Sequence, residues 1–164
     1  MIDSSAIFDA SGRYRYSLKR RWMEKGDTVT FIMLNPSTAD HEYNDPTIRR
    51  CIGLAQLWGF SSLNVVNLFA LRATEPAQLA KAKYPIGREN NLYIRANVEE
   101  ADQIIIAWGN HGNLLERDRQ VLELLSGYNL FCLGCNQSGQ PKHPLYMPKQ
   151  SSPLHFKNYS AGRR

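Results

Sequence analysis

Short apolar runs alternate with segments of helical pattern along most of this chain. The runs cover residues 28–34, 62–68, 103–108 and 130–133. Apolar runs without alternation are typical of strands that are covered on both faces. Helices are expected between them, over residues 46–58, 88–101 and 114–126. Asp45 is a suitable N-cap for the first helix, with Pro46 in its first turn and Gly59 just past its end.

The order of these elements predicts an α/β fold. Strands that alternate with helices form mostly parallel sheets with helices on both faces. We therefore expect one three-layer α/β/α domain over residues 1–164, with a central, mostly parallel, four-stranded sheet. Residues 70–87 are irregular in pattern, and residues 154–164 carry no strong signal.

A β-hairpin is predicted ahead of this sheet, over residues 7–22. Ser11-Gly12 is a turn signal, and apolar and polar side chains alternate after it. The apolar set is Tyr14, Tyr16 and Leu18, and the polar set is Arg13, Arg15, Ser17 and Lys19. Two interpretations stay open: an edge hairpin kept soluble by its charges, or a basic ribbon that faces phosphates.

Composition narrows the class of partner. The formal net charge is +5 and the pI is near 9.2, which favours an anionic partner such as nucleic acid. No apolar run approaches the roughly 18 residues of a membrane span. The N-terminus lacks the pattern of a secretory signal. We therefore expect a cytoplasmic protein with no membrane partner, and we take it to be a monomer.

The three cysteines argue against a metal centre. Cys132 and Cys135 are spaced as C-x-x-C, but a zinc or iron–sulfur site needs about four ligands, and Cys51 lies far away in the chain. We expect core packing for Cys132 and a loop thiol for Cys135. The chain has no G-x-G-x-x-G, G-x-x-x-x-G-K or H-E-x-x-H motif, so no cofactor or metal is predicted.

Polar loops follow the predicted strands. They contain Asn35-Pro36-Ser37, Asn67-Leu68-Phe69, Gly109-Asn110-His111 and Lys142-His143. The carboxyl ends of parallel strands meet at one edge, where ligands bind in open α/β sheets. An Asn inside a buried strand, such as Asn67, is costly unless it is hydrogen-bonded. We therefore expect Asn67 to point into a site or to pin a loop.

These strand ends resemble the uracil-DNA glycosylase superfamily, and more specifically a bacterial and phage branch catalogued as a domain of unknown function. The resemblance spans about residues 28–156. Four stretches carry it: Leu34-Asn35-Pro36-Ser37, Val65-Val66-Asn67-Leu68, residues 104–112 (IIIAWGNHG) and Lys142-His143-Pro144-Leu145. It implies a uracil-DNA glycosylase-like fold and hydrolysis of the N-glycosidic bond of a flipped nucleotide in DNA. The Gly-Gln-Asp-Pro-Tyr motif of the classical uracil enzymes is absent, and Leu145 replaces the Ser of a His-Pro-Ser loop.

The resemblance also implies roles for individual residues. Asn35 would position the attacking water, and Asn67 and His143 would contact the base. Asp40 or Asp45 would stabilise the cationic sugar or act as general base. Further base or substrate contacts are expected from Pro36, Ser37, Tyr43, Phe69, Trp108, Asn110 and His111. DNA contacts are expected from Arg49, Arg50, Arg72, Lys142, Leu145, Tyr146 and Lys149, with Leu145 or Tyr146 as an apolar wedge.

Plainer interpretations stay open for several of these residues. Asn35 also suits a loop cap before Pro36, Asp45 a helix N-cap, and Trp108 the core. Two further functions are kept as alternatives to a glycosylase. One is a non-catalytic nucleic-acid-binding module, and the other is a hydrolase or binder of free nucleosides or nucleotides.

Overall fold

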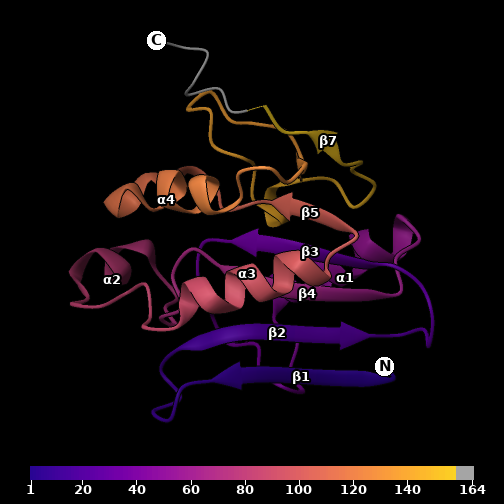
Figure 1. The fold of residues 1–164 in the computed structure, drawn as a ribbon, viewed down its shortest axis with the longest axis horizontal. Helices are drawn as coiled ribbons and strands as arrows, with labels where there is room; N and C mark the ends of the chain where they lie inside the picture. The colour runs from indigo at the N-terminus through magenta and orange to yellow at the C-terminus, as the bar shows by residue number, and fades with distance from the viewer. Residues whose placement is uncertain (158–164) are drawn as a thin grey trace.

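A seven-stranded mixed sheet runs through the computed structural model, which describes residues 1–157 (Figure 1). The strands lie in the order β1–β2–β4–β3–β5–β6–β7. Their bounds are Asp3–Phe8 (β1), Arg15–Arg21 (β2), Thr28–Met33 (β3), Ser62–Asn67 (β4), Gln103–Ile106 (β5), Leu130–Cys132 (β6) and Leu154–His155 (β7). The four predicted strands form the parallel centre, and β1, β2 and β7 add antiparallel pairs at the flanks. The α/β class is confirmed, but the sheet is larger and less parallel than predicted.

The order of the parallel strands creates a topological switch point at the centre of the sheet. The chain passes outward from β3 to β4 and then returns across β3 to β5. The connections therefore leave the carboxyl ends of β3 and β5 in opposite directions. Ligands of open α/β sheets bind outside the strand ends at such a point.

Helix α1 (Pro46–Leu57) covers one face of the sheet. Asp45 caps it, because its Oδ1 accepts a hydrogen bond from Ile48 N at 2.9 Å, and Pro46 lies in the first turn. The buried stripe of α1 packs against Phe31 and Val65 of the sheet. Its members are Ile48, Cys51, Ile52, Leu54 and Ala55. The predicted start of this helix is confirmed.

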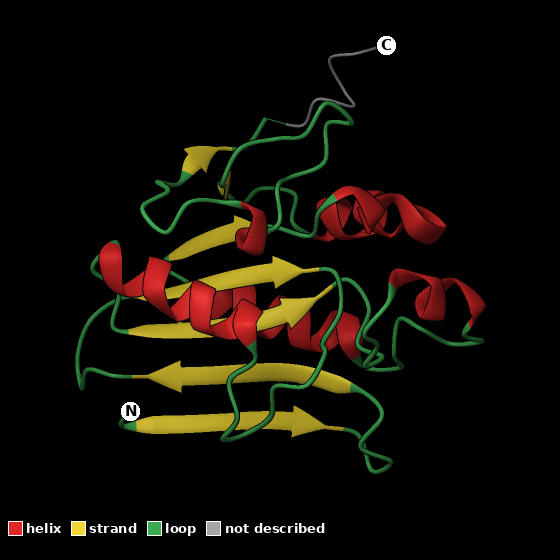
Figure 2. Cartoon of the chain, turned by 180° about the vertical axis from the view of Figure 1, so that it is seen from behind, coloured by secondary structure: helices red, strands yellow, loops and turns green. Residues whose placement is uncertain are grey.

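Helices α2 (Pro76–Lys81), α3 (Asn90–Glu100) and α4 (Arg117–Leu124) belong to the other face. Ile94 of α3 and Val121 of α4 pack with Ile32 and Ile106 of the sheet in a second core. Figure 1 shows α3 in front of the strands, and Figure 2 shows the reverse side. The fold is thus three-layered, with helices on both faces as predicted.

The β1–β2 hairpin forms, but its alternation breaks at Tyr16. The pairing register shifts between Ile7 and Phe8, which leaves Tyr16 as an extra residue in β2, as in a β-bulge. Tyr16 stacks on Tyr93 of α3 with ring centroids 5.0 Å apart, whereas Leu18 packs in the core beneath α1. The predicted single apolar face is therefore wrong.

Three other features differ from the sequence expectations. Helix α2 lies in the segment that carried no helical pattern, and it starts with a capping box between Glu75 and Gln78. The helix predicted over 114–126 begins only at Arg117, because the segment before it, η1 (Asn110–Glu116), is kinked, with non-helical backbone at Leu114 and Leu115. Strand β7 was not predicted.

In the described part of the chain, no helix combines the length and apolar character needed to cross a membrane.

Candidate functional site

The loops after the parallel strands are joined to one another at the carboxyl edge of the sheet. Ala73 N, after β4, donates to Pro36 O, after β3, at 3.0 Å. Gly109 N, after β5, donates to Pro141 O, in the loop after β6, at 2.9 Å. Gly109 has a φ of +77° and lies against the Cβ of His143. The segments named from sequence are thus joined in two pairs along this edge, which we call the rim.

Three arginines hold the loop of residues 35–45, which we name the β3 loop. Arg15, Arg20 and Arg72 each donate a guanidinium N–H to a backbone carbonyl of this loop. The acceptors are, in that order, the carbonyls of Ala39 at 3.2 Å, Asp40 at 2.5 Å and Ser37 at 3.1 Å. Arg15 and Arg20 are almost fully buried, so neither faces the solvent as a phosphate-binding ribbon would. Burial lowers the pKa of Arg15 to about 10, which leaves it cationic at neutral pH.

Asn35 joins the loops after β3 and β4. Its Nδ2 donates to Pro36 O at 2.9 Å and to Ala73 O at 2.7 Å. Both donors of the amide are therefore used to fix backbone. The Oδ1 atom accepts no bond from the residues that the structure describes, and the side chain is half-buried. Only this oxygen is left to orient a water molecule.

Asp45 uses both carboxylate oxygens on backbone amides. Oδ1 accepts from Ile48 N at 2.9 Å, and Oδ2 accepts from Ala39 N at 3.2 Å. Its negative charge acts on Arg15 and on His143. The N-cap interpretation is confirmed, and the same carboxylate supplies a negative field at the rim.

Asp40 folds back into its own turn. Its Oδ1 accepts from Tyr43 N at 2.7 Å and from Glu42 N at 2.9 Å. These two bonds, led by the one from Tyr43, hold the pKa of Asp40 below its usual value. The Tyr43 side chain is 53% exposed. The contacts of Asp40 thus stay within its own exposed turn, whereas Asp45 is buried and its contacts lie in the interior part of the rim.

The side chain of Asn67 is buried without a polar partner. It is 1% exposed, and neither Oδ1 nor Nδ2 has a hydrogen bond within residues 1–157. Asn67 pairs with Met33 in the parallel ladder, and Met33 Sδ lies 3.8 Å from Cys51 Sγ of α1. Paired strand residues share a face, so the amide points to the α1 side. An unpaired buried polar group costs roughly 1–3 kcal/mol, and a ligand-binding role would account for that cost.

The backbone at Asn67 is fixed from the opposite side of the sheet. Asn90 Nδ2 donates to Asn67 O at 2.9 Å and to Leu68 O at 3.0 Å. Arg117 Nε donates to Leu68 O at 2.7 Å, and Arg117 is itself 1% exposed. The unpaired amide is therefore presented by a rigid strand end.

His143 caps a short 3₁₀ helix, η2 (Pro144–Tyr146). Its Nδ1 accepts from Leu145 N at 3.2 Å. Burial lowers the pKa of His143, and the Asp45 carboxylate opposes this only in part. The ring is therefore neutral at pH 7, with Nδ1 as the acceptor and the proton on Nε2. No described residue accepts from Nε2, so this N–H is left free to donate.

Arg50 ties α1 to the turn that carries the predicted wedge. Its Nη1 donates to Pro144 O at 3.1 Å and also to Met147 O. The guanidinium thus positions the turn from within the protein. Leu145 and Tyr146 on this turn are 41% and 86% exposed. Two apolar side chains are held out to solvent beside His143.

Two aromatic candidates lie in the interior. Phe69 is fully buried and Trp108 is 2% exposed, and both pack in the core on the α3 side. Trp108 Nε1 donates to Gln140 Oε1 at 2.8 Å. The core interpretation of Trp108 is confirmed, and neither ring is placed to stack on an extruded base. Cys132 also packs in this core, as predicted.

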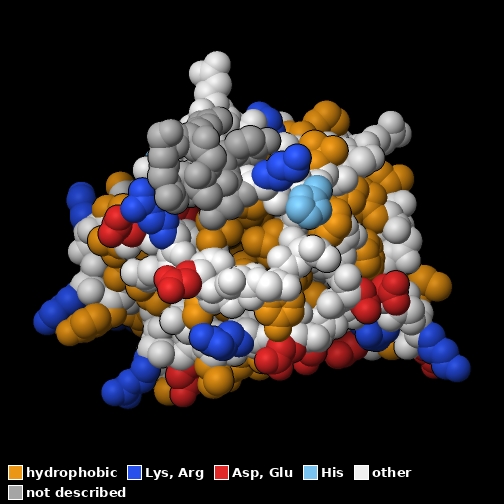
Figure 3. All heavy atoms as spheres, turned by 45° about the horizontal axis from the view of Figure 1, so that its top comes forward, with side chains coloured by type: hydrophobic (Ala, Val, Ile, Leu, Met, Phe, Trp, Pro, Cys, Tyr) orange, Lys and Arg blue, Asp and Glu red, His pale blue; other side chains and the backbone are white. Residues whose placement is uncertain are grey.

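The remaining polar candidates are on the outer part of the rim. Asn110 Oδ1 accepts from Asn136 Nδ2 at 3.0 Å and from Ser138 Oγ at 2.7 Å, which ties the loops after β5 and β6. Lys142 Nζ donates to Asn136 Oδ1 at 3.1 Å. Exposed side chains are found at Arg49, His111 and Lys149. Figure 3 shows Lys and Arg side chains spread over the face drawn there, among acidic ones, and not gathered in one patch.

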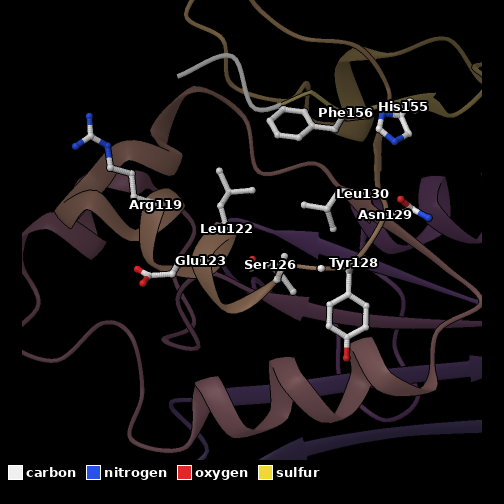
Figure 4. Close-up of a pocket in the computed structure, with 11 residues that line it drawn as sticks. Arg119, Leu122, Glu123, Ser126, Tyr128, Asn129, Leu130, His155 and Phe156 are labelled. Atoms are coloured by element: carbon white, nitrogen blue, oxygen red, sulfur yellow. The ribbon is translucent and has the colours of Figure 1, made fainter. Parts of the chain in front are cut away.

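A separate groove of about 700 Å³ lies between α4 and β7 (Figure 4). It is lined by the segment that leads into β6, including Tyr128 and Asn129, and by His155 and Phe156. Because that segment precedes β6, the groove is at the amino end of this strand. It contains none of the residues predicted for the site.

Sequence reasoning missed Arg15 and Cys51 as parts of the site. Arg15 Nε is buried without a partner, like the amide of Asn67. Burial, assisted by Asp45, raises the pKa of the Cys51 thiol, so it stays protonated. The sequence placed Arg15 in the polar set of the predicted hairpin, but the bulge at Tyr16 hid which face it occupies.

The site offers hydrogen-bonding groups rather than a nucleophile. Asn67 supplies a free donor and acceptor, His143 a neutral N–H donor, and Asn35 a free acceptor. Among the described residues, no group of three or more His, Cys, Asp or Glu is placed to hold a metal ion. This set of groups suits a planar polar ligand with donors and acceptors on one edge, such as a nucleobase.

The chain belongs to a family described as "Protein of unknown function (DUF1643)", which matches residues 15–145. The match starts at the first residue of β2 and ends within η2. It therefore includes the loops after β3, β4 and β5 and the loop after β6 as far as Leu145. No curated protein and no solved structure matches the chain.

Proposed function

We propose that this member of the DUF1643 family is a DNA glycosylase-like hydrolase, which releases a flipped base from DNA by hydrolysis of its N-glycosidic bond. The observation that carries the proposal is the buried, unpaired amide of Asn67 at the carboxyl end of β4. Its donor and acceptor match one edge of a nucleobase. A ligand that satisfies both atoms would recover the cost of leaving them unpaired.

Two residues would bind the leaving base. Asn67 would pair with the base edge, and His143 Nε2–H would donate to the base oxygen that gains negative charge. A neutral imidazole suits this role because it donates without first needing to lose or gain a proton. Asp45 links the two parts of the site. Its charge acts on His143, and its side chain caps α1. Helix α1 carries Cys51, which contacts Met33, the residue beside Asn67 in the sheet.

The sugar and the water would lie at the rim of the β3 loop. Water adds to C1′, the bond to the base breaks, and the electron pair of that bond leaves with the base. The water then loses a proton, which is taken up by the departing base anion, so that the products are the abasic sugar and the neutral base. Asn35 Oδ1 would orient this water, because its Nδ2 is already bonded to backbone. The Asp45 carboxylate would stabilise the positive charge that develops on the sugar. Asp40 is given no part, because its carboxylate caps a turn of its own.

The DNA would be engaged by the turn after His143. Leu145 and Tyr146 are exposed apolar side chains on a turn fixed by Arg50, which suits insertion into the space that a flipped base leaves. Arg49 and Lys149 are exposed and would contact phosphates. Because Asn67 is buried, the segments that cover its side chain must be displaced for a base to reach it.

Resemblance to the uracil-DNA glycosylase superfamily supports the same reaction. The matching positions Asn35, Asn67 and His143 come from three separate strand-end loops, and these loops lie along one rim. This support is independent of the unpaired amide.

The test is a panel of oligonucleotides that carry uracil and damaged or modified bases, in single and double strands. After incubation with the protein, alkaline cleavage reveals abasic sites. We expect cleavage at one or a few of these bases, and at least a hundredfold slower release by Asn67→Leu and His143→Gln, each folded like the wild type. Salt-dependent binding without any abasic product would favour the non-catalytic module. Release from free nucleosides alone would favour the third alternative.

A further inference from the structure

A second cleft lies at the carboxyl edge, on the side of the β1–β2 hairpin. Its volume is about 760 Å³, and its lining includes Tyr14, Tyr16, Tyr84, Lys83, Arg88 and Leu115. We name it the tyrosine cleft. The segment of residues 82–88 forms one wall, and its carbonyls at Pro85 and Ile86 accept from Leu71 N and Ala70 N. The wall is therefore fastened to the segment that follows Asn67.

The floor of the cleft is held rigidly. Tyr16 is stacked on Tyr93 at 5.0 Å with a 12° angle between the rings. Tyr14 Oη donates to Tyr84 O at 2.7 Å. Gly87 has a φ of +93°, and a Cβ at this position would lie 2.8 Å from the Cβ of Ala70. Only glycine allows this close approach, so the cleft is preformed.

Two apolar side chains in the lining of the tyrosine cleft are exposed. Tyr84 is 69% exposed and Leu115 is 55% exposed. Leu115 has a φ of +53° and Glu116 a φ of +55°, a left-handed conformation that is unfavourable for residues other than glycine. Backbone strain of this kind gathers at ligand-binding segments. The strained turn places Leu115 at the cleft opening.

The charges at the cleft favour an anion. Lys83 Nζ lies 5.6 Å from the ring centroid of Tyr84. Lys83 and Arg88 are exposed, and neither forms an ion pair with a described carboxylate. The one carboxylate in the lining, Asp9, is bonded to Ser11 Oγ and Tyr14 N within its own turn. The two cations outnumber this one carboxylate, so the cleft carries a net positive charge beside an exposed aromatic ring.

We propose that the tyrosine cleft binds one nucleotide of a single-stranded DNA segment that flanks the target base. The nucleobase stacks on Tyr84, and the phosphate lies between Lys83 and Arg88. An aromatic platform beside cations is the arrangement that binds single strands without base specificity. The cleft volume falls in the range of sites for ligands of nucleotide size. The choice of DNA rests on the proposed function, whereas the stacking and the charges rest on the cleft alone.

Fluorescence anisotropy of a labelled, short oligothymidylate tests the stacking. We expect Tyr84→Ala to weaken binding roughly fivefold to a hundredfold, the range that one base stacked on an aromatic ring provides. Tyr128→Ala is the matched control, because Tyr128 is 43% exposed but lies in the groove at the amino end of β6. The control should bind like the wild type. Thermal melting of both variants verifies that they are folded.

The salt dependence of binding tests the charges. The variant Lys83→Ala/Arg88→Ala should lower the slope of log Kd against log salt by about 0.7, since these two cations hold one phosphate and each phosphate contact to a single strand contributes about 0.7. Lys25→Ala, an exposed lysine in the turn before β3, should leave the slope unchanged. Wild-type affinity in Tyr84→Ala and in the double variant would overturn the proposal, as would a wild-type protein that does not bind the strand at low salt.

The two proposals fail separately. If no oligonucleotide loses a base but Tyr84→Ala still weakens binding, the glycosylase fails and the cleft stands. If bases are released and binding is unchanged in Tyr84→Ala, the cleft fails and the glycosylase stands.

Discussion

Two asparagines a short distance apart in the fold show how environment separates a structural residue from a functional candidate. Asn90 donates to the carbonyls of Asn67 and Leu68, while the amide of Asn67 has no partner in residues 1–157. Both side chains are at most 1% exposed. A residue that stabilises the fold should be costly to replace, whereas a residue kept for a ligand should not be.

Replacement by leucine should therefore have opposite effects at these two positions. Asn67→Leu removes unpaired polar atoms, and we expect it to raise the free energy of unfolding by about 1 kcal/mol. Asn90→Leu leaves two buried carbonyls with fewer donors, and we expect a loss of roughly 1–3 kcal/mol. Urea denaturation measures both. A destabilised Asn67→Leu variant would show that the amide has a structural partner in solution.

His143 should make stability depend on pH. Burial lowers its pKa in the folded chain below the ordinary 6.5. Between these two pKa values the unfolded chain binds a proton that the folded chain does not, so acid favours unfolding. The stability that depends on a neutral His143 is fully present above pH 6.5. It is lost as the pH falls from 6.5 through the lowered pKa of the folded chain.

We expect the loss of unfolding free energy between about pH 7.5 and pH 5.5 to be smaller in His143→Gln than in the wild type. The exposed His111 provides the matched control, and His111→Gln should follow the wild type. Urea denaturation at the two pH values is the measurement. The same pH dependence in all three proteins would contradict the burial of a neutral His143.

At the scale of elements, Asp45 has two roles that one substitution cannot separate. It caps α1, and its charge acts at the rim. Asp45→Ala should cost about 0.5–2 kcal/mol of stability through the lost cap, whereas Asp45→Ser keeps a capping oxygen and should cost much less. If the charge takes part in base release, both variants lose activity while only Asp45→Ala loses stability. Thermal melting together with the release assay distinguishes these cases, and an active Asp45→Ser would limit Asp45 to capping.

Arginine side chains hold the β3 loop in place through hydrogen bonds to its backbone carbonyls. Arg20 donates to Asp40 O and to Asn44 Oδ1 from a buried position. Arg20→Met removes these bonds, so we expect amide hydrogen exchange across residues 39–45 to speed up by at least tenfold. The exposed Arg13 is the control, and Arg13→Met should leave this segment protected. Unchanged exchange in Arg20→Met would mean that the loop is fixed by other contacts.

At the scale of the whole molecule, local signals predicted the elements that depend on local physics. Apolar runs gave the four parallel strands, and Asp45 with Pro46 gave the start of α1. The edges of the fold were harder to predict from the sequence. The two-residue β7 is defined by its pairing with β6, and the faces of β2 depend on one extra residue, Tyr16.

The candidate site divides in the same way. That Asn67 must be unusual follows from a polar residue in a buried strand. That its amide is unpaired depends on the residues around it on the α1 side, where its strand neighbour Met33 contacts Cys51 from a distant part of the chain. Likewise, the apolar character of Phe69 gave no sign of whether it faces a ligand or the core. Such distinctions depend on tertiary contacts, which periodicity does not encode.

The central claim is that the rim around Asn67 and His143 releases a base from DNA. The most direct measurement is the single-turnover rate of base release, by wild-type protein and by Asn67→Leu, from the oligonucleotide that gives abasic product in the panel. We predict a measurable wild-type rate and a rate at least a hundredfold lower in a variant that is as stable as the wild type or more so. Equal rates for the two proteins, or no abasic product from any base in the panel, would contradict the claim.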